Sequence, residues 1–393
     1  MLFRSTESKT NQDKINYHID NNALGEGTPK EKVRRNIEAI KLLKELEDDK
    51  RLANPEEQEI LSQYVGWGGL PDVFDEKKDN WSQEYNELKS LLTPEEYSSA
   101  RASTLTSFYT PPIVINAIYK AIQNMGAEEV NILEPSCGTG NFLGMLPQDM
   151  QKSKLYGVEL DSISGRIAKQ LYQNANIKVQ GYEKADLPDS FYDVAIGNVP
   201  FGDFKVNDKR YDKNNFLIHD YFFAKTLDKV RPNGVIAFIT SKGTMDKANP
   251  EVRKYIAQRA DLLGAIRLPD NTFTKNAGTR VTSDIIFLQK RENLRDTNMP
   301  AWIYLNVDKN EITMNNYFID NPEMVLGRME MESTQYGFDF SCKAIEGQNL
   351  EDRLNKAIAN IHGEIKPISI ENEIETEDTS IPATPDVKNF SYA

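Results

Sequence analysis

The stretch ILEPSCGTGNF, residues 132–142, decides the fold of this chain. It reads as a short apolar strand that ends in an acid, followed by a turn with two glycines and then a helix. Gly138 and Gly140 lack a Cβ and can take positive φ, so a ligand can approach the backbone of such a turn closely. The pattern predicts a cofactor cradle, although a lone G-x-G also occurs in plain turns.

The sequence around this turn predicts a doubly wound α/β sheet, because short β-branched runs alternate with helical segments between about residues 131 and 290. Ligands of such sheets bind at the carboxyl ends of the strands, so the motifs should gather there. The expected strands are NIL (131–133), KLYGVEL (154–160), NIKVQ (176–180), YDVAIG (192–197), GVIAFIT (234–240), LLGAIRL (262–268) and SDIIFLQ (283–289). The expected helices between them lie at about 141–149, 162–174, 216–231 and 250–260.

The regions outside the sheet differ in pattern. In the N-terminal region an apolar stripe predicts a helix over 31–48, and NPEEQEILSQYVGWGGL predicts a second that begins at Pro55 and ends at Gly66. The expected organisation is a flexible arm (1–29), a helical N-terminal region (30–100), a catalytic domain (101–292), an accessory mixed region (293–365) that ends in a helix, and a disordered tail or linker (366–393).

Composition excludes several classes of function. The chain has 393 residues, of which 39% are hydrophobic and 27% charged, and it contains no apolar run of the roughly 20 residues that a membrane span needs. Its polar N-terminus lacks a secretory signal, so we expect a cytoplasmic protein with no membrane partner. Two cysteines and three scattered histidines offer no metal or disulfide spacing. The net charge of -13 argues against nonspecific coating of nucleic acid, although a local basic surface can still hold DNA.

Two further strand ends carry polar groups. Glu159 and Asp161 end the strand of YGVELD, where a carboxylate can accept ribose hydroxyls, or can be an ordinary polar strand end. In YDVAIGNVPFGDF (192–204) the strand leads into Asn198, whose amide oxygen, with a neighbouring main-chain carbonyl, can accept both hydrogens of an aromatic amine. Phe201 offers a face for an extruded base and Pro200 stiffens the turn, although N-x-P turns are common.

The order of these motifs resembles that of the DNA amino-methyltransferases over about residues 100–290. That family's aromatic-Thr-Pro segment is matched by Tyr109, Thr110 and Pro111, and its E/D-P-x-x-G-x-G turn by Glu134, Pro135, Ser136, Gly138 and Gly140. Its ribose acid is matched by Glu159 beside Leu160, and its N-P-P-Y/F turn by Asn198, Val199, Pro200 and Phe201. The polar residue that contacts the cofactor adenine is less plain: within QGYEKADLP either Glu183 or Asp186 can serve, and Glu183 is favoured.

The resemblance implies a Rossmann-like, seven-stranded class I sheet that uses S-adenosyl-L-methionine to methylate adenine N6 in double-stranded DNA, with no metal. Val199 stands where the family has proline, but the carbonyl that accepts the amine hydrogen belongs to the main chain, so activity should survive. The narrower likeness of NPEEQEILSQYVGWGGL plus the methylase motifs is to phage and conjugative-element antirestriction proteins that join a methylase to a helicase. No phosphate loop for a helicase occurs here, and the end at VKNFSYA suggests a piece of something longer.

The expected DNA contacts are less specific. Lys205, Lys209 and Arg210 follow the Asn198 turn together with aromatic residues and can hold phosphates, or can belong to a solvated loop. Phe273 can form a second wall for the base, although a loop hydrophobe anchored in the core is the more common case.

Rival functions stay open at this point. The same turn serves methyltransferases that act on protein glutamine or on RNA, and the fold can also persist as a non-catalytic DNA-binding antirestriction module. Cys137 has no histidine nearby in sequence and is interpreted as a packing residue rather than a nucleophile.

Overall fold

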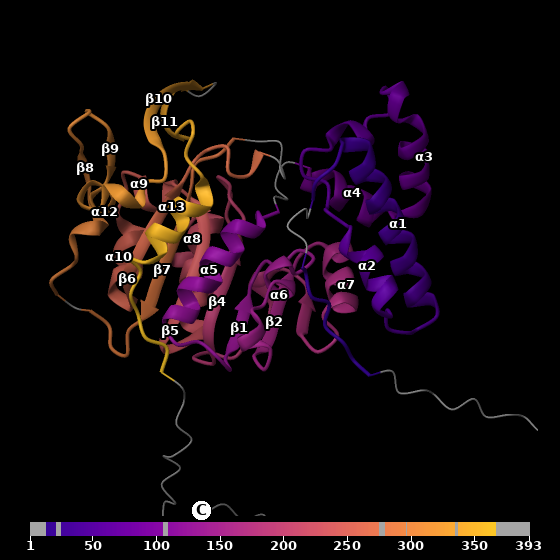
Figure 1. The fold of residues 1–393 in the computed structure, drawn as a ribbon, viewed down its shortest axis with the longest axis horizontal. Coiled ribbons are helices and arrows are strands. Elements are labelled where there is room, and N and C mark those ends of the chain that lie inside the picture. The colour runs from indigo at the N-terminus through magenta and orange to yellow at the C-terminus, as the bar shows by residue number, and fades with distance from the viewer. Residues whose placement is uncertain are drawn as a thin grey trace, which may run out of the picture.

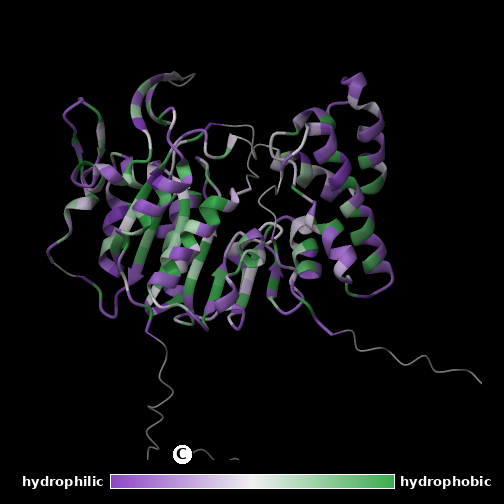
Figure 2. Cartoon of the chain, viewed as in Figure 1, coloured by the Kyte–Doolittle hydropathy of each residue, from purple (hydrophilic) through white to green (hydrophobic). Residues whose placement is uncertain are grey.

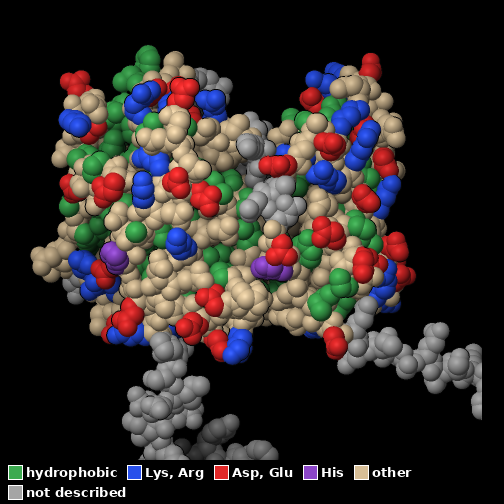
Figure 3. Space-filling model, viewed as in Figure 1, with side chains coloured by type: hydrophobic (Ala, Val, Ile, Leu, Met, Phe, Trp, Pro, Cys, Tyr) green, Lys and Arg blue, Asp and Glu red, His purple; other side chains and the backbone are tan. Residues whose placement is uncertain are grey.

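The computed structural model describes residues 13–20, 25–104, 109–274, 280–295, 297–334 and 337–366 of the chain. In these residues a seven-stranded sheet stands beside a lobe of helices (Figure 1), and the surface between the two is hollowed (Figure 3). Within the described part of the chain, no helix is both long and apolar enough to cross a membrane.

The sheet has the strand order β3-β2-β1-β4-β5-β7-β6. Neighbouring strands run parallel from β3 to β5, whereas β7 runs antiparallel to both β5 and β6. The order reverses beside β1, so the carboxyl ends of β1 and β4 border the crevice where doubly wound sheets bind ligands. The strands are β1 (Asn131–Glu134), β2 (Lys154–Glu159), β3 (Asn176–Val179), β4 (Tyr192–Asn198), β5 (Val230–Ser241), β6 (Ala260–Leu268) and β7 (Ser283–Lys290).

All seven expected strands are present, and the α/β prediction is confirmed. The central strands are buried on both faces, which is why they read as continuous apolar runs rather than as alternating ones (Figure 2). The helices that cover the sheet or its carboxyl edge are α5 (Pro112–Asn124), α6 (Asn141–Gly144), α7 (Ser162–Leu171), α8 (Ile218–Lys229), α9 (Gly243–Asp246) and α10 (Glu251–Arg259). Short 3-10 turns lie at Gln148–Met150, Tyr182–Lys184 and Asp212–Asn214.

Two of these helices differ from the sequence-based expectation. The helix expected over 141–149 ends at Gly144, and Pro147 disfavours helical backbone just before it. Helix α5 was not predicted, although its apolar face is well defined and buried against the sheet domain.

The N-terminal lobe consists of α1 (Pro29–Asp48), α2 (Pro55–Ser62), α3 (Ser82–Leu91) and α4 (Pro94–Ser103), with 3-10 turns at Pro71–Phe74 and Asp79–Trp81. Three of its helices begin with the same device, a capping box followed by proline at the first helical positions. The caps are Thr28 with Glu31, Asn54 with Glu57, and Thr93 with Glu96.

The second helix is shorter than predicted, because it ends at Ser62 rather than at Gly66. The reason is a tertiary contact: the buried side chain of Asn36 donates to the carbonyl of Gly66 (2.6 Å) and accepts from the backbone N–H of Val65 (2.9 Å). These bonds hold the backbone after α2 in a turn, with Gly66 in the left-handed region.

Part of the expected flexible arm is anchored. The backbone N–H of Tyr17 donates to Leu171 O (2.7 Å), that of Ile19 donates to Gly144 O (2.9 Å), and Ile19 is buried. Residues 13–20 therefore lie along the sheet domain, which corrects the expectation for this segment. Residues 1–12 and 21–24 of the arm, and the tail from 367, lie outside the described residues.

The accessory region packs on the edge of the same sheet. The backbone N–H of Leu326 donates to Arg267 O (2.8 Å), and that of Asp270 donates to Cys342 O (2.6 Å). Its final helix packs on α5, and the hairpin β10-β11 stands at the upper edge of the sheet (Figure 1). The elements are β8 (Leu305–Val307), β9 (Thr313–Asn315), α12 (Asn316–Asp320), β10 (Arg328–Thr334), β11 (Gly337–Lys343) and α13 (Leu350–Ile358), with 3-10 turns at Ala301–Ile303 and Pro322–Met324. The domain boundary at 292 stays a prediction.

Candidate active site

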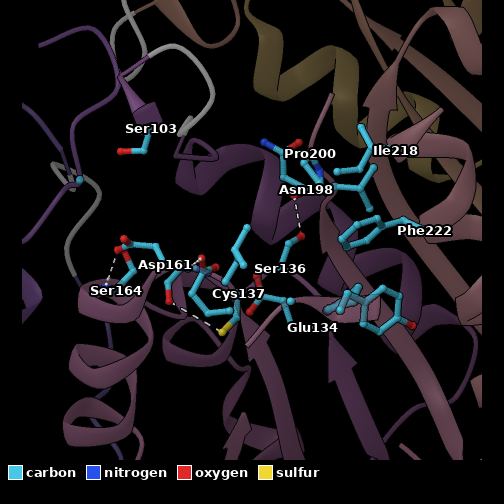
Figure 4. Close-up of a pocket in the computed structure, with 18 of the residues that line it drawn as sticks. Ser103, Glu134, Ser136, Cys137, Asp161, Ser164, Asn198, Pro200, Ile218 and Phe222 are labelled. Atoms are coloured by element: carbon cyan, nitrogen blue, oxygen red, sulfur yellow. Dashed lines mark hydrogen bonds between the residues drawn. The ribbon is translucent and has the colours of Figure 1, made fainter. Parts of the chain in front are cut away.

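A cavity of about 570 Å³ opens at the carboxyl ends of β1, β2 and β4 (Figure 4). It brings together residues from every motif that the sequence singled out for the cofactor and the acceptor amine. The expected site residues among its lining are Tyr109, Thr110, Glu134, Pro135, Ser136, Gly138, Glu159, Leu160, Glu183, Asn198, Val199, Pro200 and Phe201. The segments meet because parallel strands present their carboxyl ends at one edge of a sheet.

The turn after β1 is shaped for a ligand at Gly138. This residue has φ +55, and a Cβ built on it would meet no other protein atom within 4 Å. Gly138 lines the cavity, so this open space is part of it. The neighbouring Ser136 donates its hydroxyl to the carbonyl of Asn198 (3.0 Å), which ties this turn to the end of β4.

Gly140 differs from Gly138 in its surroundings. It also has positive φ (+87), but a Cβ there would lie 2.4 Å from the ring of Tyr172. Gly140 caps α6 and is not among the residues that line the cavity. The lack of a side chain at Gly140 therefore leaves room for the Tyr172 ring, and its expected contact with the cofactor stays a prediction.

Glu134 is an unusual group to bury at this place. It is 2% exposed, and its Oε2 has no hydrogen-bond partner in the described part of the chain. Burial raises the pKa of Glu134 well above its ordinary value, and the nearby Glu159 carboxylate raises it further. A buried carboxyl group with an unpartnered oxygen that lines a cavity can form a hydrogen bond with a polar ligand group.

Glu159 is held rigidly at the end of β2. Its carboxylate accepts the backbone N–H of Gly138 and of Asp161, both at 2.7 Å. Burial raises the pKa of Glu159 to about 7, although these hydrogen bonds act in the opposite direction. Leu160 beside it is 75% exposed and lines the cavity, so it offers an apolar surface next to the acid.

The turn Asn198–Phe201 follows β4 directly and is called the catalytic turn below, after the role that the sequence predicts for it. The backbone N–H of Val199 donates to Ile239 O on β5 (3.1 Å), which continues the sheet pairing past the strand end. Val199 is buried, whereas Phe201 is half-buried and faces the cavity. Further apolar side chains line the cavity with this turn. Phe204 is one of the aromatic residues that the sequence placed beside the basic residues after the turn, whereas the sequence analysis did not single out Val206, Ile218 and Phe222.

The strap Tyr109–Pro111 lies before α5. Tyr109 accepts a weak hydrogen bond from Thr139 (3.5 Å), and Thr110 is buried in the cavity wall. Pro111 does not line this cavity, because it caps α5 and faces a second cavity of about 370 Å³. Pro111 therefore starts the helix, and its expected contact with the cofactor stays a prediction.

The loop after the catalytic turn is anchored to α8. The buried Lys225 donates to Asp208 (3.0 Å) and to the carbonyl of Glu183 (3.2 Å), and Tyr221 donates to the same Asp208 (2.8 Å). The loop therefore has a fixed path between the catalytic turn and the Glu183 turn.

The predicted DNA contacts are placed unevenly. Lys205 is exposed and donates to Asn215 (2.6 Å), and Lys209 is exposed. Arg210 forms ion pairs with Asp189 and Asp228, both at 2.7 Å, so its charge is largely balanced within the protein. Phe273 is 2% exposed and lies in the core away from the cavity, which corrects its assignment as a base-stacking wall.

Sequence analysis missed a wall of the cavity that the N-terminal lobe supplies. Tyr64 and Gly66 follow α2, and Ser99, Ala102 and Ser103 lie on α4. The sequence signal that could have pointed to this wall is the glycine-rich turn YVGWGG, because left-handed glycines mark close approach of backbone to another group.

Other chemistries find no support in the described residues. Among them, no group of three or more His, Cys, Asp or Glu side chains is arranged to hold a metal ion. Cys137 is buried, and burial raises the pKa of its thiol well above its ordinary value, as suits a packing residue rather than a nucleophile.

The sequence is similar to a known protein family and to several characterised proteins. A family model described as N-6 DNA Methylase matches residues 91–324 of the 393. The chain is 28% identical over 273 residues to defense against restriction protein B of Escherichia phage P1, covering 67% of this chain and 10% of that protein. It is 26% identical over 211 residues to a type II methyltransferase of Paramecium bursaria Chlorella virus XZ-6E, covering 52% of this chain and 54% of that protein.

A further sequence relative and a solved structure are similar at lower identity. An rRNA N(6)-adenosine-methyltransferase of Caenorhabditis elegans is 22% identical over 239 residues, which cover 57% of this chain and 100% of that protein. A solved structure from Listeria monocytogenes, assigned to the class I S-adenosylmethionine-dependent methyltransferases, is 17% identical with a TM-score of 0.42, covering 69% of this chain and 91% of that one. The chain spans a tenth of the phage protein and about half of the viral methyltransferase.

S-adenosylmethionine is the expected cofactor of a protein with this match. The residues present fit such a molecule, because the cavity combines an open glycine backbone, a strand-end carboxylate and a buried unsatisfied carboxyl group. The family model covers more than half of the sequence and spans all seven strands of the sheet. The chain therefore belongs to the N-6 DNA Methylase family.

Proposed function

We propose that this protein transfers a methyl group from S-adenosylmethionine to the N6 amine of adenine in DNA. The observation that carries the proposal is that two sets of groups line one cavity. The first set is Gly138 in the turn after β1 and Glu159 at the end of β2, and the second is the catalytic turn with the aromatic residues around it. When bound, S-adenosylmethionine would supply an electrophilic methyl group, and Gly138, Glu159 and Leu160 are the residues proposed to hold it.

The chain's own residues are proposed to orient the acceptor amine. The side-chain oxygen of Asn198 and the main-chain carbonyl of Val199 would accept its two hydrogens and draw its lone pair toward the incoming methyl group. Phe201 would stack on the extruded base, with Phe204 and Phe222 lining the same end of the cavity. The surplus amine proton is proposed to leave to solvent.

DNA is favoured as the acceptor because the family is that of DNA methylases and because the viral relative is a type II methyltransferase. The rival acceptor is adenosine in RNA, which the match to an rRNA methyltransferase keeps open. By the likeness to a protein of defence against restriction, we further propose that the modification protects a mobile element's DNA.

The test is transfer of labelled methyl from S-adenosylmethionine to unmethylated duplex DNA and, in parallel, to ribosomal RNA and to protein. Label in DNA that is recovered as N6-methyladenine is expected. Label in RNA alone, or in protein alone, would overturn the DNA assignment, and binding of the cofactor without transfer to any acceptor would favour a non-catalytic module.

The two glycines of the turn should respond differently to alanine. Gly140→Ala is expected to destabilise the protein by about 2–4 kcal/mol, because left-handed strain adds to a clash with Tyr172. Gly138→Ala should cost only the strain, about 1–2 kcal/mol, but weaken cofactor binding at least about tenfold, because its Cβ enters the open space of the cavity. Thermal unfolding with and without S-adenosylmethionine separates the two effects. Equal behaviour of both variants would contradict this division of roles.

Cofactor affinity should depend on pH through Glu159. The folded-state pKa of about 7 lies above the ordinary value of 4.5, so the carboxyl is protonated at pH 6 and ionised at pH 8. An ionised carboxylate is the better acceptor for ribose hydroxyls, so affinity should rise from pH 6 to pH 8. Calorimetric titration at both values measures this change. In Glu159→Gln the rise should be lost, and a rise that persists there would show that another group is responsible.

A further inference from the structure

The N-terminal lobe contributes a continuous wall to the cavity. Ser99 and Ser103 lie one turn apart on α4, and Tyr64 and Gly66 come from the turn after α2. Figure 4 shows Ser103 across the opening from Asn198 and Pro200, and Asp161 and Ser164 on the side nearer to Ser103. The lobe therefore closes the end of the cavity that Glu159, Leu160 and Asp161 form.

This wall is rigidly supported from within the lobe. Asn36, fully buried on α1, clamps the backbone of Val65 and Gly66 with two hydrogen bonds. Trp67 packs edge-on against Tyr64 (6.3 Å between ring centres) and against Phe74 (5.2 Å). These contacts fix the position of the Tyr64 ring from behind.

The wall also contacts the strap Tyr109–Pro111 and Asp161, which lies two residues after Glu159. A Cβ on Gly66 would lie 3.2 Å from the ring of Tyr109, so the turn abuts the strap. Ser99 donates its hydroxyl to Asp161 (3.0 Å), and Asp161 in turn caps α7 by accepting from the N–H of Ser164 (2.8 Å). Because the N–H of Asp161 donates to Glu159, the lobe is connected to that carboxylate through one residue.

Several contacts outside the cavity hold the lobe on α7. Arg166 pairs with Glu96 (2.9 Å), and Gln58 donates to the carbonyls of Gln170 (2.9 Å) and Leu171 (3.1 Å). The lobe is therefore packed directly against α7, the helix that follows Glu159.

We propose that the N-terminal lobe is part of the cofactor site, with Tyr64 contacting the nucleoside end of S-adenosylmethionine and Ser99 acting indirectly, through Asp161. Tyr64 presents a phenol that stays protonated, because burial and the Asp161 carboxylate raise its pKa well above 10, so it can donate to a hydroxyl or ring nitrogen. Ser99 is a positioning residue that holds Asp161 and the β2 end. The inference rests on the proposed function only for the identity of the cofactor.

The test measures binding of S-adenosylmethionine to the full chain by calorimetry, with no nucleic acid present. Tyr64→Phe and Ser99→Ala each remove one oxygen from this wall, and Tyr85→Phe and Ser90→Ala remove the same groups from α3, outside the cavity lining. We expect the first pair to weaken binding about 5- to 20-fold and the control pair to leave it unchanged. Unchanged affinity in Tyr64→Phe and Ser99→Ala overturns the inference while leaving the proposed function intact.

A second measurement guards against a purely structural effect. Hydrogen exchange of the wild-type chain is expected to slow in residues 64–69 and 97–103 when S-adenosylmethionine is added, because the cofactor would contact both the N-terminal lobe and the sheet domain. Gly66→Ala should weaken binding, whereas Gly347→Ala, with the same left-handed backbone and no neighbour within 4 Å, should not. Protection confined to the sheet domain overturns the inference. A wild type that binds no S-adenosylmethionine overturns both the inference and the proposed function.

Discussion

Replacing Asn198 with alanine is expected to lower the rate of methyl transfer about 10²- to 10³-fold while cofactor binding persists. The side chain would contribute one of the two acceptors for the amine hydrogens, and its loss leaves the acceptor base poorly oriented. The turn itself should survive, because Ser136 bonds to the main-chain carbonyl of Asn198 and the N–H of Val199 bonds to Ile239, and alanine keeps both.

The measurement is single-turnover transfer of labelled methyl to duplex DNA with cofactor affinity determined separately. Asn310→Ala, in the exposed turn between β8 and β9, is the matched control and should transfer at the wild-type rate. A rate for Asn198→Ala close to that of the wild type would remove this residue from the mechanism.

Replacing Arg267 with methionine is expected to cost about 3–5 kcal/mol of folding free energy. Arg267 is fully buried on β6, where its guanidinium forms two parallel bonds to Asp284 (2.8 and 2.9 Å) and an ion pair with Asp246 (2.7 Å). It also lies 4.3 Å from the ring centre of Phe318 and so ties the accessory region to the sheet. Without it, two carboxylates lose their counter-charge, and the one on Asp284 is completely buried.

Urea unfolding followed by circular dichroism measures the loss. Arg328→Met removes an exposed pair with Glu330 and should change stability by less than about 1 kcal/mol. Adding Asp284→Asn to Arg267→Met should recover part of the loss, because it removes the charge that was left unpaired. A double variant less stable than the single one would show that charge burial is not the cause.

The expected strands were found because short apolar β-branched runs favour strand over helix when glycines and acids flank them. The same local patterns identified helix starts, since capping boxes and prolines act within one turn of the chain. Helix ends were predicted less well: α2 stops at Ser62 because Asn36, far away in sequence, accepts a hydrogen bond from Val65 and donates one to Gly66.

The sequence alone determined the sheet, the two turns at its carboxyl edge and the residues that would meet there, because parallel strands bring their ends together whatever surrounds them. Only the tertiary structure decided what each remaining group touches. Gly140 packs against Tyr172, Phe273 lies in the core, and Tyr64 of the helical lobe reaches the cavity. Such contacts join segments that are distant in the chain, and no local periodicity records them.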